Sequence, residues 1–224
     1  MGSTIGAILG EAVGVAVSPV PIIAVVLLLS TPKGKTNALS FLAGWLVGLG
    51  VVGAVVLALA DPTHASSDAG PAAWVGWMFL LLGVLLVLIG VRAFRHRPKG
   101  GVEPPLPKWM AAIDGFSPGR SLLVGFALAA LNPKNLTLTL AASATIASAG
   151  LATSQSFIVL AVFVVIGTLG LAFPVGIYFL GGDKAAETLG ELRHWLAMNN
   201  SAIMSVLCLV IGVKLIGNGM QTLL

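Results

Sequence analysis

The chain has 224 residues, of which 57% are hydrophobic and only 9% are charged. Soluble domains carry about 25% charged residues because their surfaces must be hydrated, so this deficit indicates that most of the surface faces lipid. The net charge of +4 comes without a run of Lys and Arg interleaved with aromatic residues, which argues against nucleic-acid binding. The single cysteine, Cys208, excludes an intrachain disulfide, a CxxC redox pair and a cysteine-rich metal site.

Six apolar stretches are long enough to cross a membrane, for which a helix needs about 20 residues. They are 5–29, 38–60, 72–91, 121–149, 157–180 and 202–223. The first has no preceding Lys or Arg and is too long for a secretory signal, so we expect it to be retained. The sequence therefore predicts an all-α, multi-pass membrane protein with six transmembrane helices.

The basic residues predict how these helices are oriented. Ten of the twelve Lys and Arg residues lie in or beside the first, third and fifth connections. The second connection carries only Asp61, His64 and Asp68, and the fourth carries no charge. Because Lys and Arg concentrate in cytoplasmic loops, we expect the odd-numbered connections in the cytoplasm. Both termini of this bacterial cytoplasmic-membrane protein would then be extracytoplasmic.

Other segments are expected at the membrane surface or between helices. Residues 187–198 are predicted to form a short interfacial helix, and residues 106–116 to lie on the membrane surface. The tryptophans near span ends are expected in aromatic belts: Trp45, Trp74, Trp77 and Trp195. Glycines at small-residue spacing predict close helix packing: Gly44, Gly48, Gly50 and Gly53.

The chain divides into two three-helix halves, residues 1–91 and 121–224, joined by a basic cytoplasmic linker, 92–120, rich in proline and glycine. Ser18-Pro19-Val20-Pro21 lies near the middle of the first span, and Asn132-Pro133-Lys134-Asn135 near the middle of the fourth. Since each half has an odd number of spans, the halves would have opposite polarity. Proline-broken spans at matching positions indicate a 3+3 inverted repeat of the kind found in transporters.

The two breaks predict a polar centre in the membrane. Proline lacks an N–H and frees a carbonyl one turn earlier, and such groups are unfavourable in hydrocarbon unless protein, water or substrate satisfies them. The alternative is that both are ordinary helix kinks, because membrane helices tolerate proline. The predicted substrate-binding residues are Ser18, Pro19, Pro21, Asn132, Pro133, Lys134 and Asn135.

Three ionisable residues, Glu11, Lys134 and Lys214, fall inside predicted spans. A charge at a helix centre costs about 2.5–3.5 kcal/mol, so such residues usually pair and line a cavity. Glu11 can pair with either lysine, neutralising it or carrying protons for coupling, and the other lysine would be left for an anionic group. Lys214 can also snorkel toward an interface. The chain has no nucleotide-binding, metal-ligand or catalytic motif, so neither a cofactor, a metal nor an enzyme activity is expected.

These motifs resemble the paired signatures of the lysine-exporter (LysE) superfamily. The chain is most similar to its actinobacterial GAP family, the peptidoglycolipid- or sulfolipid-addressing proteins, over segments 16–45 and 126–142 and in its overall plan. Val20 replaces the central glycine of the superfamily's Pro-Gly-Pro motif, which makes amino-acid export a weaker expectation. The resemblance implies a small six-span transporter, often dimeric, that helps move cell-wall glycolipids toward the surface. It marks Pro19, Pro21, Asn132, Pro133 and Lys134.

Three functions are compatible with these features. A lipid exporter would hold anionic headgroups at Lys134, with help from Lys214, Asn132 and Asn135, and would open laterally between helices. An exporter of a small solute, such as an amino acid or cation, would instead enclose a polar cavity at the midplane. A non-transporting subunit of a lipid-export complex would need no central cavity. Expected partners are membrane lipids, the substrate, a second copy of the chain and cell-envelope lipid-export proteins, with energy from an ion gradient or a partner.

Overall fold

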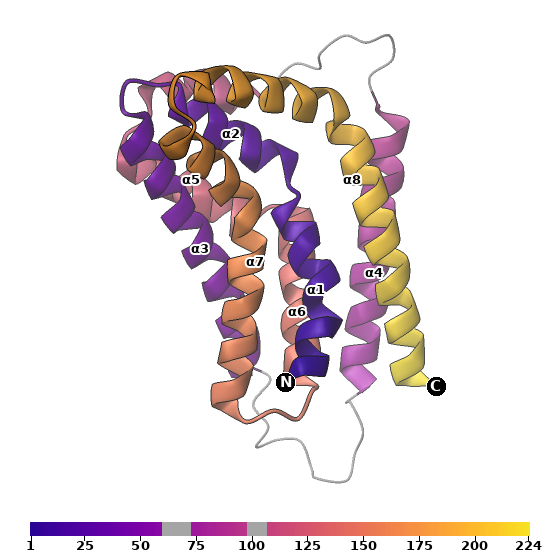
Figure 1. The fold of residues 1–224 in the computed structure, drawn as a ribbon. Helices are drawn as coiled ribbons and strands as arrows, with labels where there is room; N and C mark the ends of the chain where they lie inside the picture. The colour runs from indigo at the N-terminus through magenta and orange to yellow at the C-terminus, as the bar shows by residue number, and fades with distance from the viewer. Residues whose placement is uncertain (60–72, 98–106) are drawn as a thin grey trace.

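The computed structural model describes residues 1–59, 73–97 and 107–224, and it is all-helical with no strand in these ranges. Most helices run along one long axis, and both termini lie at the same end (Figure 1). The bounds of the elements are α1 Gly2–Ala16, α2 Pro19–Leu29, α3 Gly34–Leu59, α4 Ala73–Arg95, η2 Lys108–Gly115, α5 Pro118–Ala130, α6 Pro133–Ala147, α7 Thr153–Leu180, η3 Gly182–Lys184 and α8 Ala185–Leu223. Asp61, His64 and Asp68 of the second predicted connection lie outside the described residues.

The described helices include four that are long and apolar enough to cross a membrane, namely α3, α4, α7 and α8. A fifth unit is the pair α1 and α2, which is bent by 50°. The predicted span 121–149 is divided between α5, with 13 residues, and α6, with 15. The described ranges thus contain four or five candidate spans where six were predicted, two of them interrupted by proline. Prolines are the reason, because Pro19 and Pro133 can begin a helix but cannot continue one.

The two segments predicted at the membrane surface both pack on the bundle, and one of them is not a separate helix. Residues 187–198 do not form a separate helix but are the first part of α8, which turns so that this part lies across the end of the bundle (Figure 1). The described part of segment 106–116 forms η2. The side chains of Met110, Ile113 and Phe116 in this segment are buried against the protein, and its predicted place on the membrane surface stays a prediction. Both segments use their apolar residues to cover other helices.

Trp45 is buried in the core rather than placed in an aromatic belt. Its Nε1 donates a hydrogen bond to the Gly167 carbonyl oxygen at 3.3 Å and thereby joins α3 to α7. The prediction was wrong because α3 begins at Gly34, about three turns before Trp45. Trp77 and Trp195 are exposed as expected of interfacial residues, and the side chain of Trp74 lies outside the described part.

The glycines of α3 show why neighbouring helices approach so closely. A Cβ at Gly44 would collide with the Leu122 carbonyl of α5, and a Cβ at Gly48 would lie 2.9 Å from the Phe126 carbonyl. A Cβ at Gly53 would meet Leu160 of α7. The packing prediction is therefore confirmed for these three glycines and wrong for Gly50, whose Cβ would enter open space.

The closest helix pair is α4 and α8, which pack together along their length. Small residues recur every seven positions on each helix and face one another in antiparallel order: Gly76, Gly83 and Gly90 against Gly219, Gly212 and Ser205. A Cβ at Gly83 would lie 2.8 Å from the Gly212 carbonyl oxygen and 2.9 Å from the Ile216 nitrogen. Because these are backbone atoms, the helices would have to move apart to accept a side chain.

We expect Gly83→Ala to destabilise the fold and Gly50→Ala not to do so. The added methyl group at position 83 meets backbone, and overpacking of this kind costs about 1–3 kcal/mol. At position 50 the methyl group meets nothing, and alanine gains about 1 kcal/mol of helix propensity over glycine. Unfolding of both variants in mixed detergent micelles measures the difference. Equal stability of the two variants would contradict the proposed role of the α4–α8 contact.

Candidate functional site

The break between α1 and α2 alters the backbone hydrogen bonds around Ser18. Pro19 and Pro21 have no N–H, so they cannot bond the carbonyls of Val15 and Val17, as an unbroken helix would require. In the low dielectric of a membrane these carbonyls need other donors. The sequence at the break therefore creates acceptors inside the protein.

The Gly14 carbonyl loses its helical partner for a different reason. The Ser18 N–H, which would reach Gly14 in a continuous helix, donates instead to the Ala16 carbonyl at 3.0 Å. Ala16 also marks the close approach of a neighbouring helix, since a Cβ at Gly170 of α7 would collide with its carbonyl oxygen. The end of α1 is thus fixed between a tight turn and α7.

Side chains satisfy the freed carbonyls. Ser18 Oγ donates to the Val15 carbonyl oxygen at 2.6 Å. Lys134 Nζ donates to the Gly14 carbonyl oxygen at 2.7 Å and to that of Val17 at 3.2 Å. Its third contact is with Ser18 Oγ at 2.6 Å. An ammonium group has three donors, and here all three point to neutral oxygen atoms of the broken helix.

The second break places Lys134 where it can do this. Pro133 begins α6, and the Asn132 side chain caps the helix by accepting from the Lys134 backbone N–H at 3.1 Å. The next residue, Asn135, donates from Nδ2 to the Leu128 carbonyl at 3.0 Å. Leu128 precedes Pro133 by five residues, as Gly14 precedes Pro19. Each break therefore has one carbonyl, at the same position, that is satisfied by a side chain from the first turn of α6.

Ser18 connects the two breaks. Its hydroxyl lies 3.0 Å from Asn135 Oδ1 as well as 2.6 Å from Lys134 Nζ. The side chains of these three predicted residues are at most 3% exposed. Four other predicted residues lie beside the cluster: Pro19 and Pro21 are buried in α2, Asn132 is half-buried and Pro133 is exposed. We call Ser18, Lys134 and Asn135 the polar centre.

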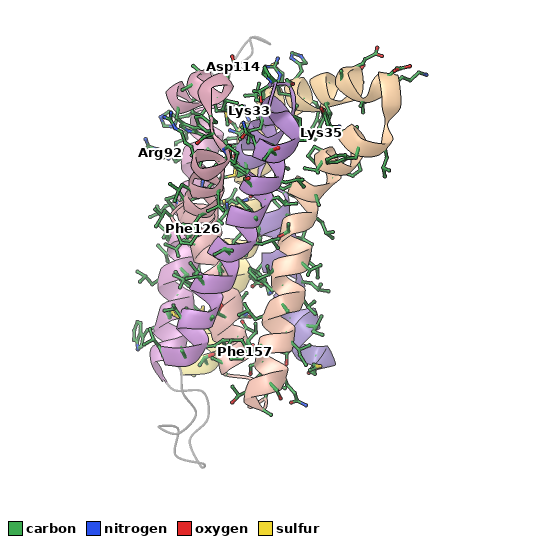
Figure 2. The ribbon with its side chains drawn as sticks, turned by 90° about the vertical axis from the view of Figure 1, so that its left-hand side faces the viewer. Lys33, Lys35, Arg92, Asp114, Phe126 and Phe157 are labelled. Carbon is green, nitrogen blue, oxygen red and sulfur yellow. The ribbon has the colours of Figure 1, made fainter. Side chains whose placement is uncertain are left out.

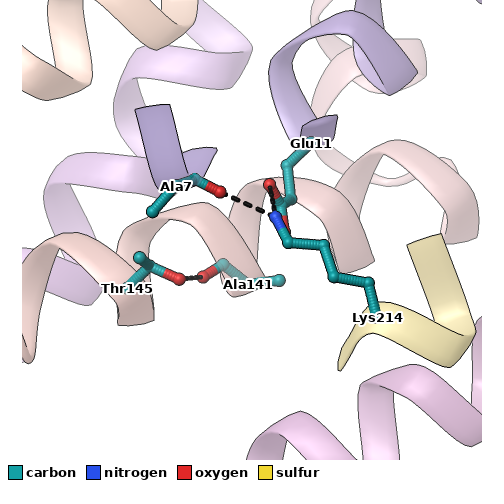
Figure 3. A network of polar contacts seen from close by, with 5 residues as sticks. All are labelled: Ala7, Glu11, Ala141, Thr145 and Lys214. Atoms are coloured by element: carbon teal, nitrogen blue, oxygen red, sulfur yellow. Dashed lines mark hydrogen bonds and ion pairs between the residues drawn. The ribbon is translucent and has the colours of Figure 1, made fainter. Parts of the chain in front are cut away.

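Glu11 pairs with Lys214 and not with Lys134, which settles the alternative that the sequence leaves open. Lys214 Nζ lies 3.0 Å from each carboxylate oxygen and also donates to the Ala7 carbonyl oxygen at 2.7 Å (Figure 3). Glu11 is 1% exposed, whereas the Lys214 side chain is 38% exposed. Among the described residues, no carboxylate lies within ion-pair distance of Lys134. Lys134 is therefore the only ionisable group of these three without an opposite charge beside it.

An apolar groove of about 380 Å³ opens beside the α1–α2 break. Its walls come from the break itself, from α7 and from the first part of α8: Ala16, Val17, Ile22, Leu169, Gly170, Phe173, Leu192 and Leu196. Leu169 and Phe173 are exposed large apolar residues. Val17 belongs both to the groove and, through its carbonyl, to the surroundings of Lys134. The groove thus leads from the surface of the protein to the edge of the polar centre.

Sequence reasoning missed the residues that shape the groove and close the centre. Gly170 is one of many glycines in apolar stretches, and only the packed structure shows that it faces the Ala16 carbonyl. The carbonyls of Gly14 and Val17 carry no sequence signal except their distance from the prolines. That distance is the one clue that could have found them.

Comparison with known proteins gives one result. The family model described as "Sap, sulfolipid-1-addressing protein" matches residues 8–221, a range that contains both breaks, Glu11 and Lys214. No curated protein and no solved structure matches the chain.

We expect Glu11 to be energetically coupled to Lys214 but only weakly to Lys134. In a double-mutant cycle with Glu11→Gln and Lys214→Gln, the coupling free energy should be about 1–3 kcal/mol, because the two groups are in contact. The matched cycle of Glu11→Gln with Lys134→Gln should give a much smaller value. The free energies of unfolding of the variants in mixed detergent micelles give both coupling values. A larger coupling in the second cycle would contradict the pairing described here.

Proposed function

The chain belongs to the sulfolipid-1-addressing protein family, and from this membership we propose that it exports a polar lipid or glycolipid of the cell envelope across the cytoplasmic membrane. The family supports involvement in lipid export, and the long apolar helices support a place in a membrane. That the chain itself carries the lipid is the finer part of the proposal. It rests on the structure around the α1–α2 break.

The observation that carries the proposal is the contact between the apolar groove and the polar centre. A polar lipid has a hydrocarbon part, which is stable only in apolar surroundings, and a headgroup, which needs hydrogen bonds or charge. The groove offers apolar surroundings and Lys134 offers a positive charge with hydrogen-bond donors. Val17 lies where the groove and Lys134 meet. The groove is lined by the exposed apolar side chains of Leu169 and Phe173, which supports entry from the lateral, lipid-facing side. A small polar solute would have no use for it.

The hydrogen bonds of Lys134 determine what must change before a lipid headgroup can bind there. Its three donors are engaged with Gly14, Val17 and Ser18, so an anionic headgroup must replace these partners. The two released carbonyls would then need donors, which hydroxyl groups of a glycolipid supply. Exposure of the site requires α1 to move away from α6. In this proposal the Glu11–Lys214 pair holds the closed arrangement, and Glu11 lies three residues before Gly14 on α1.

We also propose that the two halves are inverted repeats, with α1–α4 corresponding to α5–α8. Under this exchange the packed pairs α4–α8 and α3–α7 map onto themselves, and α3–α5 maps onto α7–α1, which is also a packed pair. The matched positions of Pro19 and Pro133 at helix starts support the same exchange. Lys33, Lys35 and Arg92 gather at the end of the molecule opposite the termini (Figure 2). By the positive-inside rule that end is cytoplasmic.

A second candidate function is that of a non-transporting subunit in a lipid-export complex, alone or as a homodimer. The burial of the polar centre favours it, because Ser18, Lys134 and Asn135 are almost inaccessible. The two candidates differ in what the purified chain can do alone. A transporter moves lipid in vesicles without partners, whereas an accessory subunit does not and supports export only in cells that contain the complex.

The central test is movement of a fluorescent sulfated glycolipid between the leaflets of reconstituted phosphatidylcholine–phosphatidylglycerol vesicles. We expect Lys134→Ala to lower the rate at least about tenfold, since a hydrogen bond to a charged group contributes about 1.5–3 kcal/mol. Lys33→Ala, a matched loss of charge outside the membrane, should leave the rate within about twofold. Unchanged movement by a folded Lys134→Ala protein would remove Lys134 from the substrate site.

Filling the groove tests the apolar part of the proposal without touching the polar centre. Leu169 and Val165 lie one turn apart on α7 and are exposed to a similar degree, 55% and 58%, but only Leu169 lines the groove. We expect Leu169→Trp to slow lipid movement by about tenfold, because tryptophan occupies space needed by the lipid chain. Val165→Trp should have little effect. Equal rates for the two variants would argue against passage through the groove.

A further inference from the structure

A second cleft, of about 430 Å³, lies between the C-terminal end of α4 and the middle of α8. The residues that matter for its chemistry are Ile89, Arg92 and His96 of α4 and Asn200, Ser201 and Met204 of α8. The cleft shares no lining residue with the groove beside the α1–α2 break. We call it the α4–α8 cleft, and it is a separate site from the polar centre.

The cleft lies at the level where the membrane ends. Arg92 is in the last turn of α4, at the end of the apolar span Val75–Arg95. Figure 2 shows it at the same end of the molecule as Lys33 and Lys35. The turn of α8 brings its first part across this end (Figure 1). A ligand in the cleft would therefore meet both water and hydrocarbon.

The α4 wall of the cleft offers positive charge that the protein does not use. Among the described residues no carboxylate pairs with Arg92, and a guanidinium binds phosphate or sulfate oxygens through two parallel hydrogen bonds. His96 lies one turn further along and donates from Nδ1 to the Arg92 carbonyl oxygen at 2.9 Å. This hydrogen bond leaves Nε2 for a ligand. Both side chains are exposed.

The α8 wall offers an acceptor without a donor. Asn200 Oδ1 is buried and has no hydrogen-bond partner in the described part of the chain. The neighbouring Asn199 is different, because its amide donates to the Trp195 carbonyl oxygen at 2.8 Å. A buried acceptor is unfavourable unless a donor reaches it. A hydroxyl group on the ligand would be such a donor.

Together these walls select a ligand with three properties. Arg92 favours an anionic group, His96 Nε2 and Asn200 Oδ1 favour hydroxyl groups, and the side chains of Ile89 and Met204 provide an apolar edge. We propose that the α4–α8 cleft binds the headgroup of an anionic lipid that also carries hydroxyl groups, a polyol phosphate or sulfate. The ligand is held at the membrane surface, and its binding does not depend on lipid movement through the polar centre.

The test is retention of defined lipids by the full-length protein in a neutral detergent, measured by native mass spectrometry. Phosphatidylglycerol has the phosphate and the hydroxyls, phosphatidic acid has the phosphate without them, and phosphatidylcholine has no net charge. We expect the order of affinity to be phosphatidylglycerol, phosphatidic acid, phosphatidylcholine. Arg92→Gln should weaken phosphatidylglycerol binding at least about tenfold, and Arg95→Gln, a matched change in the same helical turn, by less than about twofold.

Asn200→Leu tests the hydroxyl contact at nearly constant side-chain volume. It should abolish the preference for phosphatidylglycerol over phosphatidic acid and leave phosphatidic acid bound. Glycerol phosphate in solution tests whether the cleft needs a lipid or only a headgroup. If glycerol phosphate displaces phosphatidylglycerol, a free polyol phosphate is a sufficient ligand. If it does not, the cleft requires the membrane lipid. Equal losses in Arg92→Gln and Arg95→Gln, or equal retention of phosphatidylcholine, would overturn the proposal.

Discussion

A carbonyl oxygen in the middle of a membrane must find a donor, because hydrocarbon offers none. The organisation of the protein around Ser18 follows from that constraint. Two prolines free carbonyls at the end of α1, and a lysine from the other half of the chain satisfies two of the positions that lack a donor. For Lys134 to reach them, α6 must begin beside the break in α1. The need to satisfy one helix thus determines where another helix starts.

The sequence predicts the positions of the breaks but not their partners. Pro19 and Pro133 are visible because proline ends a helix wherever it stands, whatever surrounds it. The choice between Lys134 and Lys214 as the partner of Glu11 depends on which face each helix turns to α1, and both are plausible from charge alone. Trp45 shows the same limit, since its burial depends on where α3 begins and on which face of α3 packs against α7. The continuous α8 was missed because its charged and apolar parts resemble separate segments.

Helix α1 is held at two places, its C-terminal end and its middle, by interactions of different kinds. Near its C-terminal end the contacts are hydrogen bonds from Lys134 and the close approach of Gly170, and near its middle the contact is the ion pair with Lys214. Ion pairs respond to protonation and to charged ligands, whereas glycine contacts respond only to displacement. In that ion pair the carboxylate of Glu11 is 1% exposed, whereas the side chain of Lys214 is 38% exposed.

The glycines shared by α4 and α8 impose a different kind of limit. Because small residues recur every seven positions on both helices, the contact has a repeat of about 10 Å along the axis. A displacement smaller than one repeat would drive side chains of one helix into the backbone of the other. The two helices are consequently held in one register. Sliding of α4 along α8 would accordingly have to proceed by whole repeats.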